Sequence, residues 1–153
     1  EELKKLALAV SGGLTAYVDV HNSIFEEAAT IKSVVKNILG RGIPMSELLK
    51  RSERLVPLWA DIDGMIGTFH RTEYGALQPA EKRYFNVLSR YVAAVRRTID
   101  ALVERQRLLN HGSEGSAISW EDYKEKEAIY KKLVEAYLVI GQELNASSGI
   151  VFR

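Results

Sequence analysis

The stretch from Phe85 to Leu109, FNVLSRYVAAVRRTIDALVERQRLL, decides the fold. Its apolar residues recur at alternating steps of three and four positions, which places them on one side of an α-helix. The stripe consists of Phe85, Leu88, Val92, Val95, Ile99, Leu102, Gln106 and Leu109. Gln106 is its one polar member. Pro79 suits the first position of this helix, and Asn110-His111-Gly112 is expected to end it.

Two segments before this stretch repeat the same spacing. From Met45 to Tyr74 the stripe is Leu48, Ser52, Leu55, Trp59, Ile62, Ile66 and Phe69. From Leu3 to Leu39 it is Leu3, Leu6, Val10, Gly13, Tyr17, Val20 and Ile24, followed after a stutter by Ala28, Ile31, Val35 and Ile38. Gly12-Gly13 is its weak point, because each glycine costs about 1 kcal/mol in a helix. Gly40 is expected to end this helix.

A fourth segment begins at Ser119, a good N-cap, with Asp122 in a variant of the capping box. Its stripe is Tyr123, Lys126, Tyr130, Leu133, Tyr137, Ile140 and Leu144. Val134, Leu138 and Gly141 widen this stripe, as in a helix that is covered on more than one side. Residues 145–149 are expected to end the helix.

The connections, near residues 40–44, 75–78 and 111–119, are short, so consecutive helices are expected to be antiparallel neighbours. The sequence therefore predicts an all-α, antiparallel up-down-up-down four-helix bundle with left-handed packing. Pro57 removes a backbone donor inside the second helix, and a kink is expected near it. Residues 1–153 are expected to form a single domain. Because the chain starts at Glu1, inside an apparent helix, it is expected to come from a longer protein.

Composition excludes several classes of protein. The chain has no cysteine, which excludes disulfides, thiolate catalysis and cysteine-ligated zinc. The formal net charge of +1 argues against a nucleic-acid binder, whose domain is usually strongly basic. No apolar run approaches the roughly 20 residues of a membrane-spanning helix. Compartment stays open, with an extracytoplasmic or membrane-associated location favoured over a cytoplasmic one.

The sequence contains no constellation that indicates an enzyme. A di-metal site in a four-helix bundle uses Glu-x-x-His motifs, and none of His21, His70 or His111 has an acid three residues before it. Asp61 and Asp63 are two apart and point to different faces of a helix. No serine lies in a nucleophile elbow. The sequence therefore predicts a non-enzymatic protein with no cofactor and no metal ligands. His21 lies beside the apolar stripe, where a response to pH is conceivable.

Two regular patterns are candidate functional surfaces. Arg83, Arg90 and Arg97 recur every seven residues and form what we call the arginine ridge, expected to lie farthest from the core. It suits an acidic partner or anionic lipid, or it is simply a solvated face.

Tyr123, Tyr130 and Tyr137 also recur every seven residues, as the tyrosine stripe. With Tyr17 and Trp59 they are expected to line a cleft, form an interface, or pack at the boundary of the core.

The sequence favours a non-enzymatic helical module that binds a protein partner or itself, with tethering to a membrane or to a larger protein as one form. The alternative is an extracytoplasmic sensor that binds a small molecule between its helices, near Tyr17, Trp59 and Tyr137. This alternative rests on analogy of fold alone and requires a cavity of at least ~300 Å³.

Overall fold

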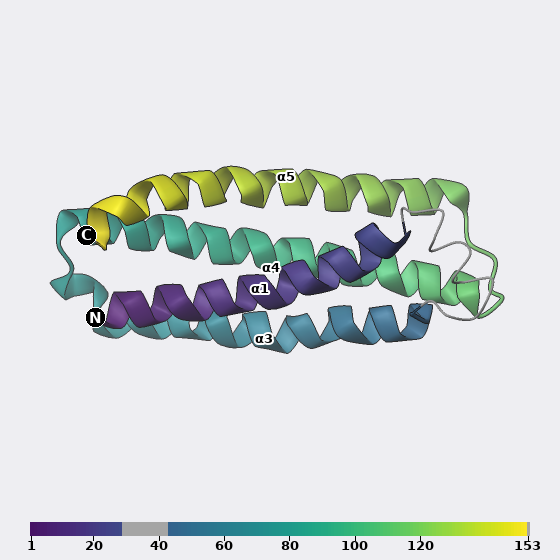
Figure 1. The fold of residues 1–153 in the computed structure, drawn as a ribbon, viewed down its shortest axis with the longest axis horizontal. Coiled ribbons are helices and arrows are strands. Elements are labelled where there is room, and N and C mark those ends of the chain that lie inside the picture. Colours follow the sequence, from purple (N-terminus) through teal and green to yellow (C-terminus); the bar gives the residue numbers. More distant parts are fainter. Residues whose placement is uncertain (29–42, 153) are drawn as a thin grey trace.

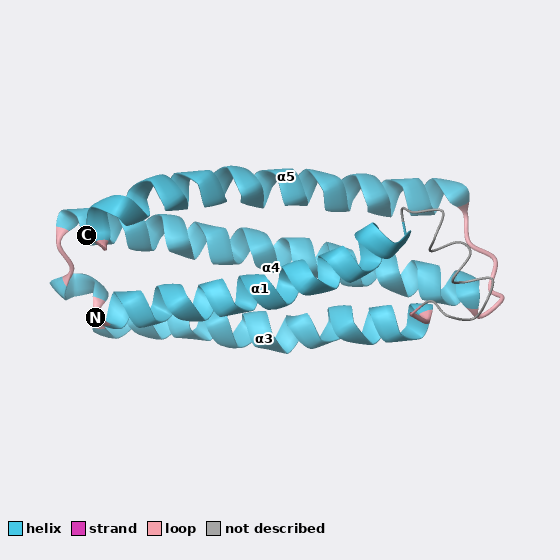
Figure 2. Ribbon diagram, viewed as in Figure 1, coloured by secondary structure: helices cyan, strands magenta, loops and turns pink. Residues whose placement is uncertain are grey.

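The computed structural model describes residues 1–28 and 43–152. Within these ranges the protein is all-helical (Figures 1 and 2). It has four long α-helices and one short 3-10 turn: α1 (Glu2–Ala28), α3 (Met45–Thr72), η1 (Tyr74–Ala76), α4 (Pro79–Ser113) and α5 (Trp120–Val151). None of the described helices is both long and apolar enough to cross a membrane.

Helix α4 is the centre of the fold. It packs along α3 and α5, and it has more buried residues than any other described helix. On its α3 side, Phe85 stacks on Phe69 and Arg96 pairs with Asp63. On its α5 side, Tyr84 contacts Phe152. The described helices therefore pack as a bundle, which confirms the all-α four-helix prediction.

Helix α1 changes neighbours along its length. Its first half packs on α3, where Gly13 faces Trp59 and Ile62. In its second half, Tyr17 and His21 contact Tyr130 of α5. Figure 1 shows α1 lying along α3 at its N-terminus and rising toward α5 at its other end. The α1–α5 contact consists of large aromatic side chains, because these two backbones approach less closely than α1 and α3.

Burial follows the predicted stripes closely in α3. The buried residues of α3 are the seven of its stripe: Leu48, Ser52, Leu55, Trp59, Ile62, Ile66 and Phe69. In α1, Leu3, Leu6, Val10, Tyr17 and Ile24 of the predicted stripe are buried. The predicted continuation of this helix over residues 29–39 lies outside the described residues. Helix α3 runs continuously from Met45 to Thr72 with Pro57 inside it.

Helix α5 is longer than the sequence predicts, because it continues through the expected end at residues 145–149 to Val151. The hydroxyls of Ser147 and Ser148 donate hydrogen bonds to the carbonyls of Leu144 and Asn145, so these residues fit within the helix. Val151 packs against the core beyond them. Helix α4 likewise passes the predicted stop at residues 110–112 and ends at Ser113. The modest helix propensity of these residues is outweighed here by packing and local hydrogen bonds.

Two predicted helix starts are confirmed. The Ser119 hydroxyl accepts hydrogen bonds from the backbone N–H groups of Glu121 and Asp122, so it caps α5. Pro79 occupies the first turn of α4, as expected. The backbone N–H of Gln78 also donates to the Glu81 carboxylate at 2.8 Å, which satisfies a donor at the start of α4.

The adjacent glycines of α1 have different surroundings. A Cβ atom at Gly13 would overlap Cδ1 of Ile62 and lie 3.3 Å from ring carbons of Trp59. A Cβ atom at Gly12 would meet nothing within 4 Å. Gly13 is therefore the residue that allows α1 to approach α3, whereas Gly12 is a solvent-facing helix position.

This difference predicts that the same substitution, glycine to valine, destabilises the protein at Gly13 and has little effect at Gly12. Gly13→Val is expected to lower the free energy of unfolding by about 1–3 kcal/mol, because the buried side chains of α3 must move apart. Gly12→Val is expected to change it by less than about 0.5 kcal/mol, as at other exposed positions. Urea unfolding followed by circular dichroism measures both. Equal losses at the two positions would contradict the close α1–α3 approach.

Candidate functional site

The arginine ridge lies on the solvent-exposed side of α4, where Arg83, Arg90 and Arg97 are all exposed. Arg90 Nη1 lies 3.3 Å from Glu143 of α5, and both side chains are about half exposed. Arg83 and Arg97 form no ion pair with any residue in the described ranges. Through Arg90 the arginine ridge therefore reaches the edge of α5.

Other arginines of α4 reach the opposite neighbour. Arg96 Nη1 lies 2.5 Å from the Asp63 carboxylate of α3, and Arg107 lies 4.0 Å from Glu53. All of these pairs are well exposed, so each contributes little to stability. Pairing within the chain also offsets part of the positive charge of α4.

The tyrosine stripe is divided by the structure between core and surface. Tyr130 and Tyr137 are buried, together with Tyr17 of α1. The Tyr17 and Tyr130 hydroxyls lie 2.6 Å apart, and the Tyr17 ring meets the Tyr137 ring edge-on with centroids 5.7 Å apart. Tyr123 is only partly buried and stacks on the exposed Trp120. The three inner tyrosines therefore belong to the chain's own core.

His21 joins the hydroxyl pair to form a polar network between α1 and α5. Its Nδ1 lies 2.6 Å from the Tyr130 hydroxyl, and its ring stacks near Phe25 at 4.6 Å between centroids. Trp59 is apart from this network. It lies beneath Gly13, and its buried indole N–H has no hydrogen-bond partner among the described residues.

A buried ion pair adjoins the network, and the sequence analysis missed it. Arg105 of α4 is 6% exposed, and its Nε donates to the Glu127 carboxylate of α5. Its Nη1 donates to Oε1 of Gln106 at 2.5 Å, and its guanidinium lies 4.6 Å from the centre of the Phe25 ring. The available signal was Gln106, the one polar residue in the α4 stripe, which marks a polar layer in the core.

Burial holds the buried tyrosines of the core in their neutral form. It raises the pKa of Tyr91, a buried residue of α4, to about 12, with a further contribution from nearby Tyr137. Burial also raises the pKa values of Tyr17, Tyr84, Tyr130 and Tyr137. These hydroxyls are therefore poor nucleophiles and poor bases near neutral pH. The contacts among Tyr17, His21, Tyr130 and Tyr137 position α1 against α5.

The raised tyrosine pKa values predict alkaline unfolding. In the unfolded chain tyrosine ionises near pH 10, whereas folded Tyr91 keeps its proton to about pH 12. Between these values the unfolded state binds fewer protons, so stability is complete below about pH 10 and falls as the pH rises. Tyr91 alone should remove about 2 kcal/mol by pH 12. Urea unfolding at a series of pH values tests this, and an equally steep fall in Tyr91→Phe would contradict it.

Helix α5 exposes large apolar side chains on the side away from the core. Val139 is 65% exposed and Ile150 is 66% exposed, and Ile129 lies on the same side. The sequence predicted that α5 is covered on more than one side, and only the side facing α4 and α1 is covered by described residues. This face adjoins the arginine ridge through the Arg90–Glu143 pair. We call the two together the α4/α5 face.

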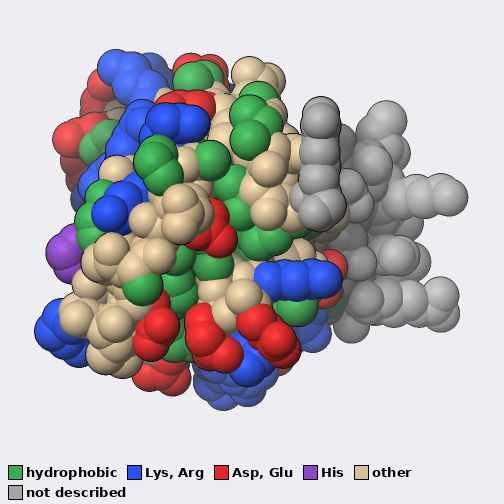
Figure 3. Space-filling model, turned by 90° about the vertical axis from the view of Figure 1, so that its left-hand side faces the viewer, with side chains coloured by type: hydrophobic (Ala, Val, Ile, Leu, Met, Phe, Trp, Pro, Cys, Tyr) green, Lys and Arg blue, Asp and Glu red, His purple; other side chains and the backbone are tan. Residues whose placement is uncertain are grey.

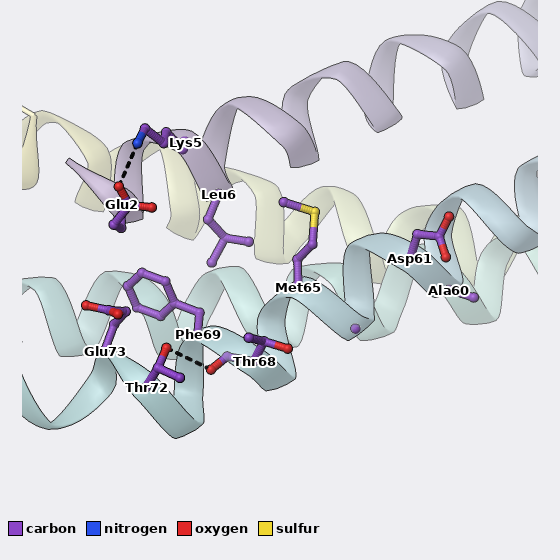
Figure 4. Close-up of a pocket in the computed structure, with 11 residues that line it drawn as sticks. Glu2, Lys5, Leu6, Ala60, Asp61, Met65, Thr68, Phe69, Thr72 and Glu73 are labelled. Carbon is purple, nitrogen blue, oxygen red and sulfur yellow. Dashed lines mark hydrogen bonds and ion pairs between the residues drawn. The ribbon is translucent and has the colours of Figure 1, made fainter.

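Two grooves lined by described residues involve α1. One groove, of about 650 Å³, runs between α1 and α3 near the N-terminus. Figure 4 shows Leu6 and Phe69 at its base, with Lys5 held by Glu2 at its rim. A smaller groove of about 190 Å³ lies between α1, α4 and α5. Neither groove is lined by Tyr17, Trp59 or Tyr137, around which the sequence analysis placed a ligand.

Charge shows no segregation at the end of the bundle where both termini lie. Figure 3 shows basic, acidic and apolar side chains intermixed there. Among the described residues, no three His, Asp or Glu side chains gather as a metal site would require. His70 stacks on Tyr74, with ring centroids 4.8 Å apart.

Comparison with protein-family models, curated proteins and solved structures finds no significant match to this chain.

Proposed function

We propose that this chain is an antiparallel up-down-up-down four-helix bundle that acts as a non-enzymatic protein-interaction module through its α4/α5 face. Opposite helix directions are supported by the order of the contacts. Phe69 and Asp63 of α3 meet Phe85 and Arg96 of α4, so positions that decrease in one helix meet positions that increase in the next. Between α4 and α5 the same holds for Arg90–Glu143 and Arg105–Glu127. A kink at Pro57 is part of the proposal.

One observation carries the functional proposal: α5 is apolar on two sides, and the described residues of the chain cover only one of them. Tyr130 and Tyr137 fill the inner side, while Val139 and Ile150 are about two-thirds exposed on the outer side. Exposed apolar side chains clustered on one helix face and bordered by charges are typical of protein interfaces. We expect the arginine ridge to form the charged edge of this interface.

Other functions have less support. A small-molecule sensor needs a pocket between the helices, and the residues expected to line it, Tyr17, Trp59 and Tyr137, are buried in the core. An anionic membrane surface would contact the ridge, but the central member of the ridge, Arg90, is already paired with Glu143. The raised tyrosine pKa values give no base or nucleophile for an enzyme near neutral pH.

Site-specific photo-cross-linking in the native cell tests the proposal. A photoreactive amino acid replaces Val139 on the outer face of α5, and in a matched control it replaces the equally exposed Leu8 of α1. We expect a discrete protein adduct from position 139 and none of comparable yield from position 8. No adduct from position 139, or the same adducts from both positions, would contradict the proposal that the α4/α5 face binds a protein.

A further inference from the structure

The exposed side of α5 carries a second heptad pattern. Eight residues follow one another at alternating steps of four and three: Glu125, Ile129, Lys132, Ala136, Val139, Glu143, Ala146 and Ile150. All eight are exposed. We call them the outer stripe. Five of them are apolar, and this spacing is the one with which two helices pack along a coiled-coil seam.

The outer stripe is separate from the core seam of the same helix. Tyr130 and Tyr137 belong to the core seam and are buried against α1 and α4. Val139 and Ile150 lie on the far side of the helix and are exposed. One helix thus carries two seams, and the described part of the chain supplies a partner helix for only one of them.

We infer that the outer stripe binds the outer stripe of a second copy of this chain, with the two α5 helices antiparallel. This inference rests on the proposed function, and it specifies the partner. Its two-fold axis passes between positions 137 and 138. In this register each residue of one outer stripe lies opposite a residue of the other, as in antiparallel helix packing. The residue numbers of each facing pair add up to 275.

Charge complementarity selects the antiparallel arrangement. The outer stripe contains one basic residue, Lys132, and one acidic residue near its middle, Glu143. In the antiparallel register Lys132 lies opposite Glu143 of the second copy, and the symmetry produces this pair twice. A parallel register would place Lys132 opposite Lys132 and Glu143 opposite Glu143. Like charges facing each other across a seam oppose association, so the parallel register is disfavoured.

Side-chain size points to the same register. Ala136 lies opposite Val139 of the second copy at the centre, and Ile129 lies opposite Ala146 on either side. Each of these apolar layers therefore combines a large side chain with a small one, which allows two helices to approach closely without overlap. Glu125 and Ile150 fall at the ends of the seam, where the glutamate reaches solvent.

The arginine ridge borders this seam. Arg90 already holds Glu143 at 3.3 Å, so in the pair of chains Glu143 lies between Arg90 of its own chain and Lys132 of the second copy. A carboxylate between two cations forms a small ionic network at the edge of the interface. Arg90 then orients Glu143, and the exposed Arg83 and Arg97 keep this edge of the interface in contact with water.

Charge reversal with sedimentation velocity tests the inference. Lys132→Glu and Glu143→Lys each place two like-charge contacts in the pair, so each variant alone is expected to associate at least about tenfold more weakly than the parent, equivalent to 1.4 kcal/mol or more. An equimolar mixture of the two variants regains both opposite-charge contacts and is expected to associate as the parent does. Lys4→Glu on α1 changes the net charge equally and is expected to have no effect. Circular dichroism confirms that each variant is folded.

Cysteine chemistry tests the register, since the chain has no cysteine of its own. When Ala136→Cys and Val139→Cys chains are mixed and oxidised, the mixed disulfide is expected to exceed either homodisulfide. A predominant 139–139 disulfide, a parent that stays monomeric, or failure of the charge-reversal mixture to associate would overturn the inference. A monomeric parent whose photoreactive position 139 captures a different protein would refute the second copy and leave the proposed function standing.

Discussion

Glu127→Ala is expected to lower the free energy of unfolding by about 3 kcal/mol, because it leaves the buried guanidinium of Arg105 without its carboxylate. The remaining partners of Arg105 are Oε1 of Gln106 and the Tyr123 hydroxyl, and neither carries a negative charge. For a chain of this length such a loss lowers the melting temperature by roughly 6–12 °C. Thermal unfolding followed by circular dichroism measures it.

The double variant Arg105→Leu/Glu127→Leu is the matched control for this prediction. Removing both charges also removes the cost of taking them out of water, so the double variant should be at least about as stable as the parent. The contrast between the single and double variants is the diagnostic result. If both lose the same stability, the ion pair does not act as a buried unit. If Glu127→Ala is neutral, Arg105 reaches water in solution.

Trp59→Ala should have a comparable or larger effect, a loss of about 3–5 kcal/mol, because it leaves a large cavity in the core. Trp59 is 1% exposed, and it lies where α1 and α3 approach at Gly13. The unfolding free energy from urea titration is the measurement. Trp120→Ala, at a residue that is 64% exposed, is the control and is expected to change stability by less than about 0.5 kcal/mol.

Trp59→Phe refines this prediction. The indole N–H of Trp59 has no hydrogen-bond partner, and a buried donor without a partner costs about 1–3 kcal/mol. Phenylalanine removes that donor and leaves a smaller cavity than alanine, so the two effects oppose each other. We expect a loss below about 1.5 kcal/mol. A loss as large as that of Trp59→Ala would show that the indole N–H is satisfied in solution.

The heptad patterns predicted much of the fold, because burial in a bundle follows helix periodicity. All seven stripe residues of α3 are buried. The end of α5 was mispredicted, since Ser147, Ser148 and Gly149 resemble a stop signal in the sequence. Whether such residues end a helix depends on what lies beyond them, and here Val151 and Phe152 find packing partners.

The candidate site was less predictable than the fold. Tyr17, Trp59, Tyr130 and Tyr137 were identified as core positions, but their spacing could not show which of them meet in space. Arg105 was missed because a charged residue next to a stripe is normally solvated. It is buried here because α4 is covered by α3 on one side and α5 on the other, and because Glu127 lies opposite. Such a pairing depends on tertiary packing, and its one local signal was the polar residue Gln106 in the α4 stripe.

If two chains pair through the outer stripe of α5, the solution mass measured by light scattering must depend on protein concentration. We predict that the mass rises with concentration from the 17.2 kDa of the chain toward twice that value. Val139→Glu should keep the mass at that of one chain at every concentration while leaving the helical content unchanged. A parent protein that stays at 17.2 kDa throughout would contradict the account.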